Sequence, residues 1–245
     1  MLKEEDYVSL PAGEFSMGRA DTQKDCPEMR VRLTRGFRIS RYPITQAQWL
    51  EVMDNRPWQS EKVAHRIAIR EGARFPAVGV DWHEANRFAE ELSRVCKAGL
   101  FLPTEAQWEY AIRAGSSSLF FWGDEQSQAA DYGWFRKRGE SSSDPNVHLR
   151  EVGLLKPNPW GLFDMTGNIS EWVRDRCDVS PGSVYIEEAH YPAESADFFH
   201  ESGKYGISRN GDYRMREGCM ASHYKITREL TERSAGLGFR LVMEG

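Results

Sequence analysis

The sequence contains little that would support a disulfide framework, a membrane span or a secretion signal. Its four cysteines, Cys26, Cys96, Cys177 and Cys219, are widely separated and form no CxxC pair, which favours free thiols in a reducing compartment. No stretch approaches the roughly 18 apolar residues of a membrane-spanning helix. No apolar segment follows the acidic start of the chain, so no signal peptide is visible. These absences predict a cytoplasmic protein without a membrane partner.

A concentration of positive charge is also missing. The chain has 32 Lys and Arg against 37 Asp and Glu, a formal net charge of −5, and the two signs are mostly interspersed. No run of basic residues could follow the phosphates of a nucleic acid. The charge pattern therefore predicts no nucleic-acid partner.

Aromatic residues, glycine and proline are abundant instead. There are 8 Trp, 9 Tyr and 12 Phe although only 40% of the residues are hydrophobic, so the core must depend on large rings. The 21 Gly and 11 Pro favour turns over regular elements. We expect a loop-rich fold with aromatic anchors in its core.

Three segments alternate apolar and polar residues as strands do. Residues 7–18 predict a hairpin around a Pro-Ala-Gly turn, and residues 30–40 predict one half-buried strand. Residues 236–242 predict a closing strand. Two polar loops, residues 137–147 and 178–204, are long enough to be functional, ordered by a ligand, or disordered.

Three segments carry a capping box, in which the cap residue and the residue three positions later exchange hydrogen bonds between side chain and backbone. The pairs are Thr45 with Gln48, Asp81 with Glu84, and Thr104 with Gln107. The helix after Asp81 has an apolar stripe that should place Val95 and Cys96 in the core, and Gly99 should end this helix. Strands, helices, loops and a final strand follow one another without βαβ alternation, which predicts an α+β fold.

Seven motifs, in order along the chain, resemble one protein family. They are PAGEFSMG, FRISRYPITQAQW, FPAVGVDWHEANRFAEEL, LFLPTEAQWEYAIRAG, FFWGDE, NPWGLFDMTGNISEWVRD and GLGFRLV. From about residue 7 to residue 242 the sequence is similar to the formylglycine-generating enzyme (sulfatase-modifying factor) family. The resemblance implies a C-type-lectin-like α+β fold, loop-rich with short antiparallel strands and a few helices, in a single domain over residues 1–245.

Enzymes of this family oxidise a sulfatase cysteine to formylglycine with copper held by two cysteines. In the matching stretch, Asn210 replaces the first Gly of a Gly-Gly-Ser motif and Asp212 replaces its Ser. Met215 and Met220 fall on the two cysteine positions, and Cys219 is one residue out of register. Because two thiolates select copper(I), we expect neither copper binding nor this oxidation. Asp212, Cys219 and His223 are the candidate reacting groups of an altered chemistry.

The resemblance implies calcium sites as well, since calcium is held by carboxylate and carbonyl oxygens. The ligands of the first site would be the side chains of Asp164 and Glu171 and the carbonyls of Gly167 and Ile169. Alternatively, Asp164 caps a turn and Glu171 pairs with Arg174 or Arg240. Asp131 and Asp144 would be the nearest matches to a second site, or simply two solvated loop aspartates.

The C-terminal part of the chain is rich in long side chains of both charge signs. The candidate binding residues are Arg214, Arg216, Glu217, His223, Tyr224, Lys225 and Arg228. Tyr and Arg are enriched at binding hot spots. We therefore expect a non-catalytic binding or scaffold protein that presents residues 212–228 to a protein or peptide. The alternatives are an enzyme of altered chemistry in the same groove and a ligand-binding variable protein of a diversity-generating retroelement.

Overall fold

The structure is a computed structural model that describes residues 3–19, 28–64, 69–142, 144–183 and 194–244. The strands are β1 (Tyr7–Leu10), β2 (Gly13–Met17), β3 (Met29–Leu33), β4 (Phe37–Ser40), β5 (Gly99–Phe101), β6 (Gly133–Trp134), β7 (Thr166–Gly167), β8 (Ser170–Cys177), β9 (Glu194–Ala196), β10 (Tyr205–Arg209), β11 (Lys225–Glu229), β12 (Leu237–Gly238) and β13 (Val242–Glu244). The helices are α1 (Gln46–Met53), α2 (Glu61–Ala64), α3 (Trp82–Cys96), α4 (Glu105–Arg113) and α5 (Ala129–Tyr132), with short 3-10 turns that include η5 (Glu217–Met220).

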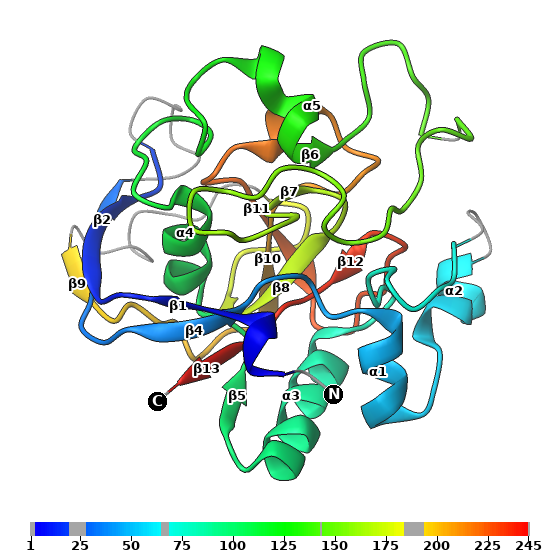
Figure 1. The fold of residues 1–245 in the computed structure, drawn as a ribbon, viewed down its shortest axis with the longest axis horizontal. Coiled ribbons are helices and arrows are strands. Elements are labelled where there is room, and N and C mark those ends of the chain that lie inside the picture. The colour runs from blue at the N-terminus through cyan, green and yellow to red at the C-terminus, as the bar shows by residue number, and fades with distance from the viewer. Residues whose placement is uncertain (1–2, 20–27, 65–68, 143, 184–193, 245) are drawn as a thin grey trace.

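Within the described residues the strands form four small sheets. One has the order β1-β4-β13-β5, a second β11-β10-β8-β12, a third β2-β3-β9, and a fourth pairs β6 with β7. Figure 1 shows α1 and α3 together on one side of the β1-β4-β13-β5 sheet, and the long connection of residues 114–165 on the other. Short strands, few helices and long connections confirm the predicted loop-rich α+β fold.

The three predicted capping boxes are all present. The side chains of Thr45, Asp81 and Thr104 each accept a hydrogen bond from the backbone N–H of the residue three positions later, and the backbone N–H of each cap donates one to the side chain of that residue. The tryptophans that follow the two threonines, Trp49 and Trp108, have no exposed surface. Each box therefore starts a helix next to an aromatic anchor, as the sequence predicts.

The predicted N-terminal hairpin is wrong. β1 and β2 are both strands, but β1 pairs antiparallel with β4 and β2 pairs antiparallel with β3. The segment of residues 30–40 likewise forms two strands, β3 and β4, in two different sheets. The chain changes sheets between β1 and β2 and again between β3 and β4, whereas β2 and β3 are neighbours in one sheet.

The end of α3 also differs from the prediction. Val95 is 59% exposed and Cys96 is exposed, so neither residue fills the core. The helix ends at Lys97, whose φ of 53° is left-handed, and Gly99 belongs to β5. The apolar stripe of α3 is buried only as far as Leu92.

The predicted closing strand is two short strands. β12 pairs with β8, and β13 pairs with β4 and β5. Residues 184–193 of the predicted loop 178–204 and Cys26 lie outside the described residues. Among the described helices, none combines the length and the apolar character that crossing a bilayer requires.

Candidate functional site

The segment that the resemblance aligns with a copper site connects β10 to β11. Its backbone is held by residues far away in the sequence. Arg136 N donates a hydrogen bond to Met215 O (2.8 Å), and Ser222 N donates one to Leu119 O (2.9 Å). The connection of residues 210–224 is thus fastened to the long connection that follows α4, close to α5 and β6 (Figure 1).

Asp212, one candidate reacting group, is buried against Arg214. Its Oδ1 atom accepts hydrogen bonds from Arg214 N (2.8 Å) and Arg214 Nε (3.0 Å). The Arg214 guanidinium also donates to Ser234 Oγ (2.7 Å). A Cβ atom on Gly236 would lie 2.6 Å from the Asp212 carboxylate, so the carboxylate is closely covered on that side. The charge of the Asp212 carboxylate is therefore balanced inside the fold by the guanidinium of Arg214, which points toward it.

Cys219, the second candidate, lies beside Tyr224 and Met215. Burial and a hydrogen bond with Cys219 raise the pKa of Tyr224 above its ordinary value. The Tyr224 hydroxyl also lies 3.9 Å from Met215 Sδ. Six half-buried side chains pack here over a small apolar cluster, and we call them the Tyr224 surface. They are Leu119, Trp122, Phe135, Met215, Cys219 and Tyr224.

His223, the third candidate, faces buried charged groups. Burial lowers the pKa of His223 to about 4; Glu109 opposes this shift, whereas Arg209, Arg113 and Arg19 add to it. The imidazole is consequently neutral at pH 7. His223 precedes Tyr224 in the chain, but the charges that act on its pKa are those of Glu109 and the buried arginines.

The three candidate reacting groups have different neighbours. Asp212 is bound to Arg214, Cys219 to Tyr224, and His223 faces the buried charges around Arg209. The described contacts thus do not assemble the three groups into one catalytic constellation.

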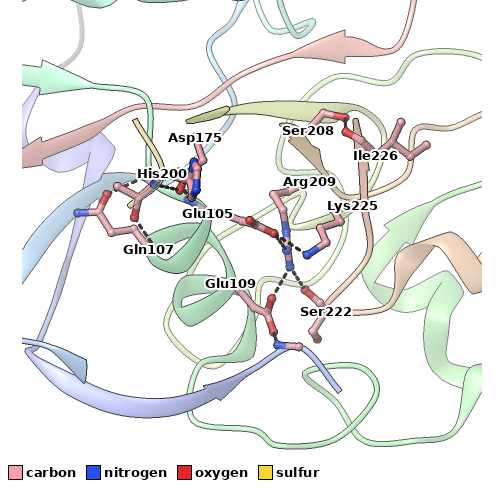
Figure 2. Close-up of polar contacts among 12 residues, drawn as sticks. Glu105, Gln107, Glu109, Asp175, His200, Ser208, Arg209, Ser222, Lys225 and Ile226 are labelled. Atoms are coloured by element: carbon pink, nitrogen blue, oxygen red, sulfur yellow. Dashed lines mark hydrogen bonds and ion pairs between the residues drawn. The ribbon is translucent and has the colours of Figure 1, made fainter. Parts of the chain in front are cut away.

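The charges that act on His223, Glu109 and Arg209 among them, belong to a buried charge cluster, and Figure 2 shows this cluster. Arg209 Nη1 contacts Glu105 Oε1 at 2.7 Å, and Arg209 Nη2 contacts Glu109 Oε2 at 2.7 Å. The same Nη2 donates to Ser222 O (2.7 Å), and Lys225 Nζ lies 3.4 Å from Glu105 Oε1. Because these charges are shielded from water, the loss of one partner would leave an uncompensated buried charge.

Helix α4 supplies both carboxylates of this cluster. Glu105 and Glu109 are four residues apart and therefore share one helix face. Arg113, four residues further, donates from Nε to Glu109 Oε1 (2.9 Å). Burial raises the pKa of Glu109, but Arg113 and Arg209 outweigh it and hold that pKa at about 2.

Asp175 of β8 adjoins the cluster at the start of α4. It accepts hydrogen bonds from Glu105 N (2.7 Å) and His200 N (2.9 Å). Burial and the negative charge of Glu105 raise the pKa of Asp175 to about 7. Our sequence reasoning missed this cluster, although two glutamates on the otherwise buried face of a capped helix were a usable signal.

The first predicted calcium site contains a different set of partners. Glu171 Oε2 accepts hydrogen bonds from Arg240 Nε (2.7 Å) and Trp108 Nε1 (2.9 Å), and Glu171 Oε1 accepts one from Arg240 Nη2 (2.9 Å). Asp164 Oδ2 accepts from Gly153 N (2.7 Å), and burial raises the pKa of Asp164 to about 6. Both carboxylates that the resemblance assigns to a calcium ion thus accept hydrogen bonds from protein donors.

The other predicted calcium ligands are bound to protein groups as well. The carbonyls of Gly167 and Ile169 both accept hydrogen bonds from Asn210 Nδ2. Asp131 forms an exposed ion pair with Lys156 (2.8 Å), and Asp144 Oδ1 accepts a hydrogen bond from Asn146 N (2.8 Å). In the described parts of the chain, no group of three or more His, Cys, Asp or Glu residues could hold a metal ion. Calcium binding stays a prediction for metal analysis.

The remaining candidate binding residues differ in exposure. Arg216 is exposed and Glu217 is half-buried, and both follow Met215 of the Tyr224 surface in the chain. Lys225 belongs to the buried cluster. Arg228 is 7% exposed and donates to Ser208 Oγ (2.7 Å), so it supports the sheet and does not face a partner.

Known proteins match this chain over most of its length. The chain is 27% identical over 222 residues to the serine/threonine-protein kinase pkn1 of Chlamydia pneumoniae, which covers 84% of this chain and 32% of that protein. It is 30% identical over 223 residues to the formylglycine-generating enzyme of Streptomyces coelicolor, covering 69% of this chain and 68% of that enzyme. It is 25% identical over 240 residues to the inactive C-alpha-formylglycine-generating enzyme 2 of Bos taurus, covering 78% of each. The chain therefore spans about a third of the length of the chlamydial relative.

Solved structures share the fold. PvdO from Pseudomonas aeruginosa superposes with a TM-score of 0.79 at 26% identity and covers 98% of this chain and 94% of its own. Variable protein 1 of Treponema denticola superposes with a TM-score of 0.80 at 21% identity, covering 98% and 95%. The family model of the sulfatase-modifying factor enzyme 1-like domain matches residues 2–245. The chain belongs to the sulfatase-modifying factor (formylglycine-generating enzyme) family.

Proposed function

We propose that this protein is a non-catalytic binding module that presents the Tyr224 surface, together with Arg216 and Glu217, to a protein or peptide partner. The observation that supports this proposal most is a contrast within the 210–224 connection between a buried, paired carboxylate and a group of half-buried apolar side chains. On the inner side Asp212 is neutralised by Arg214. On the outer side, half-buried apolar and aromatic side chains gather around Tyr224.

This combination suits binding better than chemistry. A reacting carboxylate must contact its substrate, whereas the Asp212 carboxylate is 1% exposed and paired. Trp, Tyr and Arg are enriched among the few residues that contribute most of the binding energy at protein interfaces. Tyr224 and Trp122 belong to the Tyr224 surface, and the exposed Arg216 directly follows Met215 of that surface in the chain.

The relatives support the same function. One is an inactive member of the family, and in the chlamydial protein the matching region is about a third of a longer chain. A domain without chemistry of its own that works beside other domains is consistent with both. Whether the partner is an extended peptide or a folded protein, we expect Tyr224 to be its main contact.

The test is co-purification of partners from the native host, with Tyr224→Ala and Arg216→Ala as the test variants. The control variant is Lys97→Ala, at an exposed position on the far end of α3. We expect the two test variants to lose a partner that the wild type and the control retain, by at least tenfold. If both test variants keep every partner at wild-type levels, the proposal is wrong. Conversion of a cysteine peptide to an aldehyde by the wild type would also refute it.

A further inference from the structure

Asn210 lies where β10 ends and the 210–224 connection begins. It is 1% exposed, and its φ of 67° places it in the left-handed region. A side chain in this conformation is strained unless it forms compensating contacts. At this position the resemblance leads us to expect a glycine, which would adopt the same backbone without strain.

The carboxamide of Asn210 is fully used by the turn of residues 167–169. Asn210 Nδ2 donates to Gly167 O (3.0 Å) and to Ile169 O (3.1 Å). Asn210 Oδ1 accepts a hydrogen bond from Gly167 N (3.0 Å). The two carbonyls thus both point at the Nδ2 atom of Asn210. Carbonyl oxygens that converge in this way are also typical ligands of a calcium ion.

The carboxylate expected at this site is compensated by an arginine. Arg240 is fully buried and reaches both oxygens of Glu171, while Trp108 Nε1 donates to Glu171 Oε2. A divalent cation next to Glu171 would have to displace a guanidinium of the same sign, and two such charges repel strongly in a buried site.

We infer that the Asn210 carboxamide and the Arg240 guanidinium together replace a divalent cation, so that the turn of residues 164–171 is closed by protein groups alone. The two carbonyls and the Glu171 carboxylate are the oxygens that calcium would bind, and each has a protein donor instead. This inference does not depend on the proposed binding function.

Asn210 also connects this turn to the candidate binding segment. Ser170 Oγ donates to Asn210 O (2.9 Å), and Tyr213 N donates to Asn168 O (3.1 Å). The start of the 210–224 connection is therefore anchored to the turn by contacts that need no ion. Its position should not respond to removal of divalent cations.

The first test uses the wild-type protein. Metal analysis after gel filtration in calcium-containing buffer should find less than about 0.1 calcium per chain, and EGTA should leave the melting temperature unchanged. One calcium per chain that survives gel filtration, or a melting temperature that falls with EGTA, would overturn the inference. This measurement stands even where a variant fails to fold.

The second test is Asn210→Gly, a change that suits the left-handed backbone and removes only the carboxamide. Two carbonyls and one amide then lose buried partners, so we expect the melting temperature to fall by about 5–10 °C. Hydrogen exchange in a peptide spanning residues 164–172 should become faster, because Gly167 N–H donates to Asn210.

The matched control is Lys97→Gly, at an exposed left-handed position that ends α3. Glycine relieves the same backbone strain there without removing a buried side chain, so the melting temperature should stay the same or rise slightly. If Asn210→Gly behaves like this control in both melting temperature and exchange, the carboxamide does not close the turn and the inference is wrong.

Discussion

Two buried arginines, Arg209 and Arg240, bind carboxylates in different ways. Arg240 donates from Nε and Nη2 to one carboxylate, that of Glu171, and from Nη1 and Nη2 to the backbone carbonyls of Ser40 and Phe163. Arg209 divides its terminal nitrogens between Glu105 and Glu109. Arg240 and Glu171 form what we call a closed pair, in which one arginine serves one carboxylate. Arg209 is instead shared between two carboxylates.

Arg240 and Glu171 therefore form a structural contact, whereas the charges around Arg209 also influence the pKa values of neighbouring groups. The charges of Arg240 and Glu171 balance locally, and the pair connects β8 to the end of the chain. The cluster around Arg209 also contains Arg113 and Lys225, so cations outnumber the two glutamates among these five residues. The excess positive charge is felt by His223, whose pKa it helps to lower. The shared cluster therefore acts on the protonation of His223, the residue before Tyr224.

Replacement of Arg209 should have the largest effect. Arg209→Met leaves Glu105 and Glu109 buried without their common partner, which costs about 3–5 kcal/mol of the free energy of unfolding. Urea denaturation measures this loss. Lys156→Met, which breaks the exposed pair with Asp131, is the control and should change stability by less than about 1 kcal/mol. A loss below about 1 kcal/mol for Arg209→Met would contradict the buried cluster.

Glu171→Gln should have an intermediate effect. The amide keeps the shape of the side chain and one acceptor, but it removes the charge opposite Arg240 and places an NH₂ group near a guanidinium. We expect a loss of about 2–3 kcal/mol by the same denaturation measurement. Asp131→Asn makes the same chemical change at an exposed pair and is the control. Equal effects of the two changes would mean that the closed pair contributes little.

The smallest effect should be the pH dependence that His223 adds. Its folded pKa of about 4 lies below its ordinary value of 6.5, so protons bind the unfolded state more readily. The contribution of His223 is constant above pH 6.5 and is lost as the pH falls toward 4. His223→Gln should therefore reduce the stability lost between these pH values by roughly 1–3 kcal/mol.

Asp175 also titrates in this pH range, and its contribution to stability has the opposite sign. Its pKa is raised to about 7, so its own contribution increases stability as the pH falls from 7 toward 4. Because Asp175 is present in both the wild type and His223→Gln, its effect cancels in the difference between the two. A difference that does not change with pH would show that His223 titrates normally.

Features with local causes were predicted well from the sequence. The capping boxes at Thr45, Asp81 and Thr104 form because each cap and its partner are three residues apart and meet as soon as the helix begins. The aromatic anchors Trp49 and Trp108 follow from the same motifs. The family was also evident, since its motifs lie in the chain in a fixed order.

Features that depend on distant partners were predicted poorly. β1 and β2 look like a hairpin, but each pairs with a later strand in a different sheet. Arg209 meets Glu105 across 104 positions of sequence, and no local pattern announces that contact. Asp212 looked like a reacting group because nothing nearby in sequence shows that it is buried and that Gly236 lies close against its carboxylate.

The sequence by itself determined the helix starts, the aromatic core and the family, because these depend on short spacings and on ordered motifs. It also indicated the loss of the two copper-binding cysteines, with Met215 and Met220 at their positions. Only the tertiary structure decided which charges are paired and which side chains remain on the surface around Tyr224. Burial and charge pairing arise between segments that are remote along the chain, so they exist only once the sheets are assembled.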